Sequence, residues 1–478
     1  MKGLQHKLFY TIGIIVISIG VQAQSLDQAK KLYNEGKYAE AKPAFEKLVR
    51  TSPSNSSYNH WYGVCCFETG DLDNAEKYLS VAVKRKVQEA YRYMAEVNYL
   101  KYKFNEAVEM YDEYIALLTK KKQDTQIWEE KKKLAETAAR MLAKTEDIRI
   151  IDSMVVDKDD FLSVYHMSNE SGSLQPFNEF FQSSDPASSV VYMNEKGDKI
   201  YYAHETQDSR YCLFTQSKLM DKWGDEKQLP MNINSNNDDN YPFVLSDGVT
   251  MYYASKGNGS LGGYDIFVTR YNTSSDTYLA PEQLGMPFNS PYNDYMYVLD
   301  EAKGLGWFAT DRFQPEGKVV IYLFIPNETR KNVETDDEDV KRARAMITSI
   351  SDSWTPDADY SELVKLAKTK DTSGQEVKKD FDFIITDNIV YYTMDDIQSP
   401  EARALYEKVI GRRNQLQQLN TKLDEQRTAY SAADKAGREK LKTSILQLEQ
   451  QIENLLLQPD ELEKQARNAE ITFLRNKK

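Results

Sequence analysis

The residues that could support chemistry are few and are spread along the chain. Gly257–Gly262 has the GxGxxG spacing, but a dinucleotide-binding loop of this kind connects a strand to a helix. Alternating, strand-like segments flank these glycines on both sides, so we expect a turn between strands. His204 and Glu205 follow another strand-like segment and could take part in acid–base chemistry. However, the chain contains no HExxH, Walker, GxSxG or metal-type Cys/His motif. We therefore predict no catalytic residue and no enzyme activity.

One Asn- and Asp-rich segment could supply oxygen ligands to a cation such as Ca²⁺. Its polar residues alternate along the chain: Asn232, Asn234, Asn236, Asp238 and Asn240. Their spacing is not that of an EF-hand loop. Because Asn and Asp also stabilise turns by bonding to their own backbone, we expect turns here, and we predict neither a metal site nor a cofactor.

The composition excludes some classes of function. The chain has 478 residues and a formal net charge of −13, which argues against nucleic-acid binding because phosphate contacts need a basic face. At about 100–200 residues per domain, the length corresponds to about two to four domains. The three cysteines, Cys65, Cys66 and Cys212, are too few for a disulfide framework, and we expect them to be small buried residues.

Residues 1–23 have the pattern of a secretory signal peptide. Lys2 and Lys7 precede an apolar run from Leu8 to Val21, and Ala23 provides a small residue for cleavage. The run is too short to span a membrane, and no later stretch is long enough. We therefore expect a mature chain that begins near Gln24, has no transmembrane segment and lies outside the cytoplasm.

Residues 24–147 contain a repeated helical pattern. The segments 36–41, 70–75 and 102–107 are copies of one another, and their final alanines lie 34 and 32 residues apart. This pattern resembles the tetratricopeptide repeat, a pair of helices in which small residues allow close packing. Residues 126–147 would form the closing helix that such an array needs.

The resemblance implies a concave, partner-binding groove lined by the first helix of each repeat. The corresponding positions in this chain are Tyr33, His60, Phe67, Arg92, Glu96 and Tyr99. A lining of aromatic and charged side chains suits an extended peptide or a helix of a protein partner. Alternatively, Phe67 and Tyr99 belong partly to the core and His60 lies on the surface.

Residues 148–398 contain a second repeat, built from strands. The step Tyr201-Tyr202-Ala203 recurs as Tyr252-Tyr253-Ala254 and as Trp307-Phe308-Ala309, 51 and 55 residues apart. Short strands with a period of about 40–55 residues are typical of β-propeller blades. Tyr241–Arg270 resembles the WD40-like (PD40) repeat of TolB-type propellers almost throughout, and Met286–Arg312 resembles it in part.

The number of blades is open. Residues 148–326 have room for about four blades. If residues 381–393 form a further strand pair, the propeller extends to residue 398 and contains an insertion at about 327–379. That insertion includes a helix at Val340–Ser349 and the acidic run Glu334–Asp339, which we expect to be a solvated linker.

Residues 399–478 are expected to form a helical, coiled-coil-like tail. Apolar residues recur three and four positions apart in two stretches that are separated by Ser431–Gly437. Either two helices fold back as a hairpin, or one long helix dimerises. In both forms an exposed apolar stripe would be available for self-association through residues 412–457. Pro459 would lie in the first turn of a third helix.

The order of signal peptide, tetratricopeptide repeats and TolB-like propeller resembles periplasmic proteins of the Bacteroidota, some of which take part in type IX secretion. Those relatives carry an OmpA-like domain, whereas this chain ends in helices. The resemblance implies a non-enzymatic periplasmic scaffold or adaptor, which binds outer-membrane or secretion proteins. One alternative is a propeller enzyme, or a sensor of a glycan or peptide, with a mouth lined by His204, Asp265 and Asp311. Another is a structural role tied to peptidoglycan.

Overall fold

The structure is a computed structural model that describes residues 25–183, 189–219, 222–370, 381–386 and 389–476. Its contacts divide the chain into two compact units, Met1–Asp371 and Thr372–Lys478. The expected signal peptide lies outside the described residues. None of the described helices is both long and apolar enough to cross a membrane.

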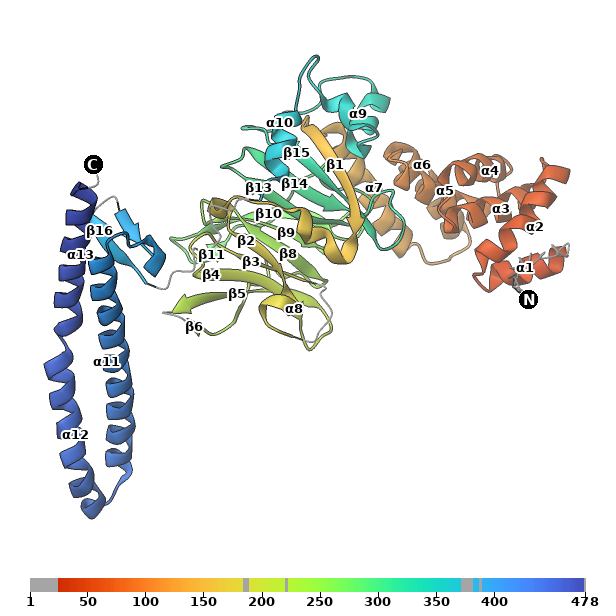
Figure 1. Cartoon of the computed structure of the whole chain (residues 1–478). Coiled ribbons are helices and arrows are strands. Elements are labelled where there is room, and N and C mark those ends of the chain that lie inside the picture. The colour runs from red at the N-terminus through yellow and green to blue at the C-terminus, as the bar shows by residue number, and fades with distance from the viewer. Residues whose placement is uncertain (1–24, 184–188, 220–221, 371–380, 387–388, 477–478) are drawn as a thin grey trace, which may run out of the picture. The chain divides into compact units, whose positions relative to one another are not determined.

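The first unit begins with a row of helices (Figure 1). They are α1 (Leu26–Asn34), α2 (Tyr38–Thr51), α3 (Ser56–Glu68), α4 (Leu72–Lys84), α5 (Gln88–Leu100), α6 (Phe104–Lys120) and α7 (Gln126–Ala143). Helices α1–α6 form three consecutive pairs, and α7 packs on α6. The expected helical repeats and closing helix are therefore present.

Small residues at repeated positions bring the paired helices close together. Ala41, Ala75 and Ala107 are completely buried. Gly63 lies against α4 so closely that a Cβ atom there would come within 2.8 Å of Leu79 Cγ. The cysteines of α3 are also buried and free, as the sequence predicts.

The turn inside each helix pair requires a left-handed backbone. Gly36 and Gly70 have φ angles of 75° and 77°, and the corresponding residue of the third pair is Tyr102, with a φ of 56°. A residue with a Cβ atom pays about 1–2 kcal/mol for this conformation, which glycine adopts freely. The third repeat therefore keeps a tyrosine where the backbone favours glycine.

The rest of the first unit contains three antiparallel sheets among the described residues. The first sheet consists of β2 (Ser173–Pro176), β3 (Val190–Met193), β4 (Lys199–Glu205), β5 (Tyr211–Leu219), β6 (Lys222–Trp223) and β7 (Lys227–Gln228). The second consists of β8 (Asp239–Val244), β9 (Thr250–Ser255), β10 (Asp265–Asn272), β11 (Thr277–Tyr278) and β12 (Glu282–Gln283). The third consists of β13 (Asp294–Asp300), β14 (Leu305–Thr310), β15 (Lys318–Ile325) and β1 (Arg149–Asp157), which lies beside β15 (Figure 1).

The three aromatic-aromatic-Ala steps occupy equivalent strands, β4, β9 and β14. Ala203, Ala254 and Ala309 at their ends are completely buried in one hydrophobic core. The 3₁₀ helix η1 (Lys158–Val164) contacts β1, β2 and β15, and so lies between the first and third sheets. The glycine-rich segment Gly257–Gly262 connects β9 to β10, so the expected turn between strands is present.

The segment after β15 contains the helix expected near residues 340–349 and a second helix. Its acidic residues Asp336–Asp339 are exposed, as expected. However, α9 (Glu338–Met346) and α10 (Ser361–Lys368) pack on the strand-rich domain, because each contributes a buried alanine, Ala345 and Ala367. Arg344 of α9 also donates to the carbonyl of Ile148 at 3.2 Å. The helices thus belong to the domain core.

The second unit is a helical hairpin with a small sheet (Figure 1). Helix α11 (Pro400–Ala432) packs against both α12 (Lys435–Leu455) and α13 (Gln458–Asn476), which is the hairpin alternative. The strand pair expected within 381–393 forms as β16 (Phe383–Thr386) and β17 (Ile389–Tyr391). Among the described residues, these two strands pair only with each other. They pack on α11 and α13, with the Phe383 and Tyr406 rings 4.1 Å apart. The domain boundary therefore lies at residues 371/372, and the pair is not a blade of the first unit.

Candidate functional site

Three predicted partner-binding residues surround the ring of Tyr93. The rings of His60 and Phe67 lie 6.1 and 5.6 Å from it, and the Arg92 guanidinium lies over it at 4.2 Å. Tyr33 joins this group through Tyr38, whose ring centre is 5.4 Å away. Tyr93 itself is not among the residues predicted from the sequence. Because it follows His60 by one repeat length (93 − 60 = 33 residues), the period alone could have identified it.

His60 is not a surface residue. Its side chain is only 8% exposed, and burial lowers its pKa to about 4, so the imidazole is neutral at neutral pH. Arg92 carries the charge of this group and pairs with Glu89 at 2.7 Å. The result is an aromatic cluster with one cation, a combination suited to contacts with a partner's apolar and acidic side chains.

The other two predicted residues are used within the chain. Glu96 forms an ion pair with Lys131 of the closing helix. Tyr99 is 8% exposed, and its hydroxyl donates to the carbonyl of Leu261 in the strand-rich domain at 2.7 Å. Tyr99 therefore belongs to the contact between the repeats and the strand-rich domain, which local sequence patterns do not reveal.

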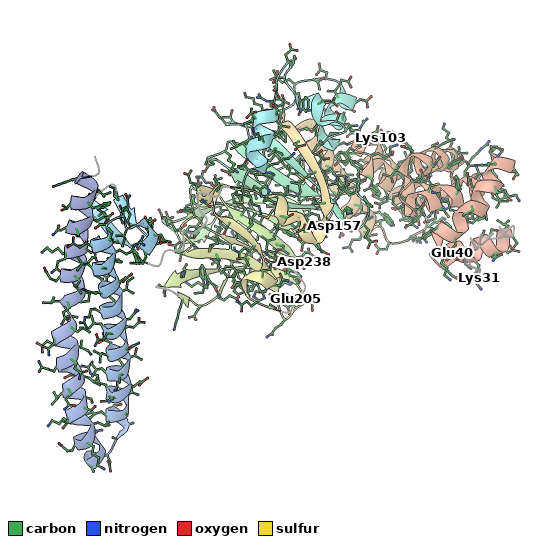
Figure 2. All side chains as sticks on the ribbon, viewed as in Figure 1. Lys31, Glu40, Lys103, Asp157, Glu205 and Asp238 are labelled. Carbon is green, nitrogen blue, oxygen red and sulfur yellow. The ribbon has the colours of Figure 1, made fainter. Side chains whose placement is uncertain are left out.

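Tyr102 lies at the centre of that contact. Its side chain is completely buried, in a cluster that includes Met286 and Ala345. The side chain of Arg342 in α9 donates to the Tyr102 carbonyl at 3.3 Å. Figure 2 labels the next residue, Lys103, at the end of the helical row that meets the strand-rich domain. The repeats are therefore anchored through their third turn.

A buried ion pair lies beside this anchor. Arg312 and Asp294 are both completely buried, and their side chains are 2.7 Å apart. Arg312 also donates to the carbonyls of Phe288 and Ala345, at 3.2 and 3.3 Å. The guanidinium thus has partners on the third sheet, on the loop before it and on α9, and it links these segments.

A cleft of about 790 Å³ opens where the repeats meet the strand-rich domain. The repeats contribute Phe67, Leu72 and Leu100, and the strand-rich domain contributes Tyr292 and Phe313 among others. Phe313 is 49% exposed although it is a large apolar residue. Its ring lies 5.1 Å from that of Tyr292, and its φ angle is 57°. The structure therefore holds an exposed aromatic ring in a strained backbone conformation, a feature found at functional sites.

The residues considered for a catalytic or ligand-binding mouth do not meet. His204 lies in another pocket, where it stacks on Phe214 at 4.1 Å and contacts Glu226 at 3.1 Å. Asp311 lines the cleft, whereas Asp265 is completely buried. In the described part of the chain, no three His, Cys, Asp or Glu side chains are grouped so that they could hold a metal ion.

The comparisons with known proteins agree with the helical part of this description. No curated protein and no solved structure matches the chain. A family model, however, matches residues 26–93, which span α1–α4 and the first part of α5. That model describes the tetratricopeptide repeat, so residues 26–93 are similar to this repeat and the N-terminal helical region is tetratricopeptide-like.

Proposed function

We propose that this chain is a non-enzymatic adaptor of the cell envelope and that its cleft binds an extended segment of a protein partner. The observation that carries the proposal is the shared lining of the cleft, in which Phe67 of the repeats and Phe313 of the strand-rich domain border one cavity. A segment bound there contacts both domains at once. Tetratricopeptide repeats suggest protein–protein interaction, and an extended peptide suits such a groove.

The aromatic residues of the cleft are suited to anchor a partner. Aromatic side chains provide large contact areas at a low cost in conformational entropy, and they are enriched among the residues that dominate binding energy. Tyr292 and Phe313 come from the strand-rich domain, and Phe67 extends the aromatic cluster around Tyr93 into the cleft. The partner segment in this proposal carries apolar side chains two or more residues apart, so that it reaches both walls.

The wider proposal concerns architecture and location. We infer that the strand-rich domain is a TolB-type, WD40-like propeller, which the pairing of β1 with β15 supports because it joins the start of the domain to its last sheet. The signal-peptide pattern of residues 1–23 supports a periplasmic location. The partners are then outer-membrane or secretion components. The helical hairpin provides a second binding surface, either for self-association through residues 412–457 or for another partner.

The test is affinity purification of the tagged mature protein from its native envelope after mild cross-linking, followed by mass spectrometry. Wild type is compared with the double variant Phe67→Ala/Phe313→Gly and with Met231→Ala, whose side chain is 87% exposed outside the cleft. We expect envelope proteins to be recovered in stoichiometric amounts with wild type and Met231→Ala but not with the double variant. Recovery of the same proteins with all three would refute the role of the cleft, and a chain that is recovered alone would refute the adaptor.

A further inference from the structure

A second pocket lies inside the strand-rich domain, where tyrosines from two sheets converge. The rings of Tyr241, Tyr264 and Tyr295 lie 5.5–6.0 Å from one another. Tyr241 has a φ angle of 56° and is only 7% exposed, so a strained backbone places its ring in the group. A cavity of about 530 Å³ is lined by Tyr241 and Tyr264, within the size range of small-molecule sites, whereas Tyr295 lines the cleft.

Two lysines lie on the tyrosine faces at this cavity. The Lys256 ammonium is 4.7 Å from the centre of the Tyr264 ring and pairs with Asp238 at 2.8 Å. The Lys158 ammonium is 4.4 Å from the centre of the Tyr295 ring and donates to its hydroxyl at 2.9 Å. Figure 2 labels Asp238 and also Asp157, which precedes Lys158.

The two ammonium groups differ in whether a carboxylate balances their positive charge. Lys256 has a carboxylate partner, whereas no carboxylate of the described residues lies within ion-pair distance of Lys158. The pKa of Lys158 is lowered, chiefly by burial. The negative charge of Asp311 opposes this shift, and the positive charge of Lys256 adds to it. The position therefore favours an additional negative charge beside Lys158.

We propose that this pocket binds a carboxylate on an apolar body, with the carboxylate against Lys158 and the body against Tyr241 and Tyr264. The cavity lining also includes the apolar side chains of Phe161, Leu162 and Val190. Asp238 and Asp159 line the same cavity, and their negative charges disfavour a phosphate dianion more than a singly charged carboxylate. Among the described residues, the lining also has no arginine to hold a phosphate by two parallel hydrogen bonds.

The carboxylate has two possible sources, a free organic acid and the C-terminus of a protein partner. The second source is within reach of the cleft because Lys158 borders both cavities. Binding of a free acid does not depend on the adaptor function. The inference about the pocket and the proposal about the cleft can therefore fail separately.

The test is isothermal titration of the folded mature protein with N-acetylphenylalanine, its neutral amide and phenyl phosphate. We expect the acid to bind at least about tenfold more tightly than the amide, because a lost charge-assisted contact of about 1.4 kcal/mol is a tenfold change. Lys158→Met should weaken binding of the acid by a similar factor. The matched control Lys227→Met, which changes an exposed lysine of β7 outside the pocket, should leave the affinity for the acid unchanged.

Equal binding of acid and amide, no binding of the acid, or tighter binding of phenyl phosphate would each overturn the proposal. A second titration, with acetyl-Gly-Gly-Phe, distinguishes the two sources. If the tripeptide binds more tightly than the single residue and Phe313→Gly removes that gain, the carboxylate is a peptide terminus that enters from the cleft. If both bind equally, the pocket is a site for a free acid.

Discussion

Replacing Tyr102 by glycine tests which contributes more to stability at the third turn: the burial of its side chain or the strain of its backbone. The side chain is completely buried, and removing a buried aromatic ring costs about 3–5 kcal/mol. Glycine relieves the left-handed backbone, which returns about 1–2 kcal/mol. We therefore expect Tyr102→Gly to lower the free energy of unfolding by a net amount of about 1–4 kcal/mol.

The assay is urea unfolding followed by far-ultraviolet circular dichroism and by tryptophan fluorescence. Because Tyr102 joins the repeats to the strand-rich domain, its loss should also separate their unfolding into two transitions. A matched control is Lys86→Gly, since Lys86 has a φ of 62° but an exposed side chain. That variant gains the same relief without losing a buried ring, so it should be about 1–2 kcal/mol more stable than wild type.

Tyr102→Phe isolates the hydroxyl. This group makes no hydrogen bond of acceptable geometry with the described residues, so its removal should change stability little. If Tyr102→Gly is as stable as Lys86→Gly, the ring contributes nothing and the anchoring role is wrong. If Tyr102→Phe is as unstable as Tyr102→Gly, the hydroxyl rather than the ring carries the contact.

Four further predictions concern separate sites. Arg312→Met leaves Asp294 as an uncompensated buried charge and should cost about 3–5 kcal/mol of unfolding free energy, part of which Arg312→Met/Asp294→Asn should restore. Burial raises the pKa of Asp239 to about 6 from 3.8, so this group favours the folded state at low pH and loses that contribution as pH rises through 6. The free energy of unfolding of Asp239→Asn, measured by urea unfolding, should therefore exceed that of wild type by up to about 3 kcal/mol at pH 7.5 and by almost nothing at pH 4. Phe313→Gly should raise the thermal midpoint slightly, because the strained φ of 57° is relieved, and should weaken partner recovery at the same time; a lower midpoint would contradict the strain argument. Burial raises the pKa of Cys65 to about 12 and that of Cys66 to about 11, so both should react with a thiol reagent at pH 8 only on unfolding; rapid labelling of the native protein would show that α3 opens locally.

The elements that the sequence predicts well are those with a local cause. The helix pairs follow from small residues that recur every 34 and 32 positions, because only small side chains permit the close approach seen at Gly63 and Ala75. The strands β4, β9 and β14 follow from the recurring aromatic-aromatic-Ala step, which supplies apolar residues to both buried faces of each strand. Both causes act within one repeat.

The elements that the sequence predicts poorly depend on distant partners. The pair β16–β17 has the alternation of a blade, but alternation does not specify which core covers the apolar face, and here α11 and α13 cover it. Similarly, His60, Phe67 and Arg92 were identified because they follow the repeat period. Tyr99 was assigned to the groove for the same reason, but its partner, Leu261, is 162 residues away.

The anchoring of the third repeat has a consequence for binding. Phe67 and Phe313 line the cleft from different domains, so their separation is set by the buried contact at Tyr102, Tyr99 and Arg312. If that contact were loose, a partner would have to order the two walls and would lose part of its binding energy in doing so. Because the contact is buried and hydrogen bonds at Tyr99 and Tyr102 cross it, the walls are held in place before the partner arrives. Loosening the anchor by Tyr102→Gly should therefore weaken partner binding, although Tyr102 itself is completely buried.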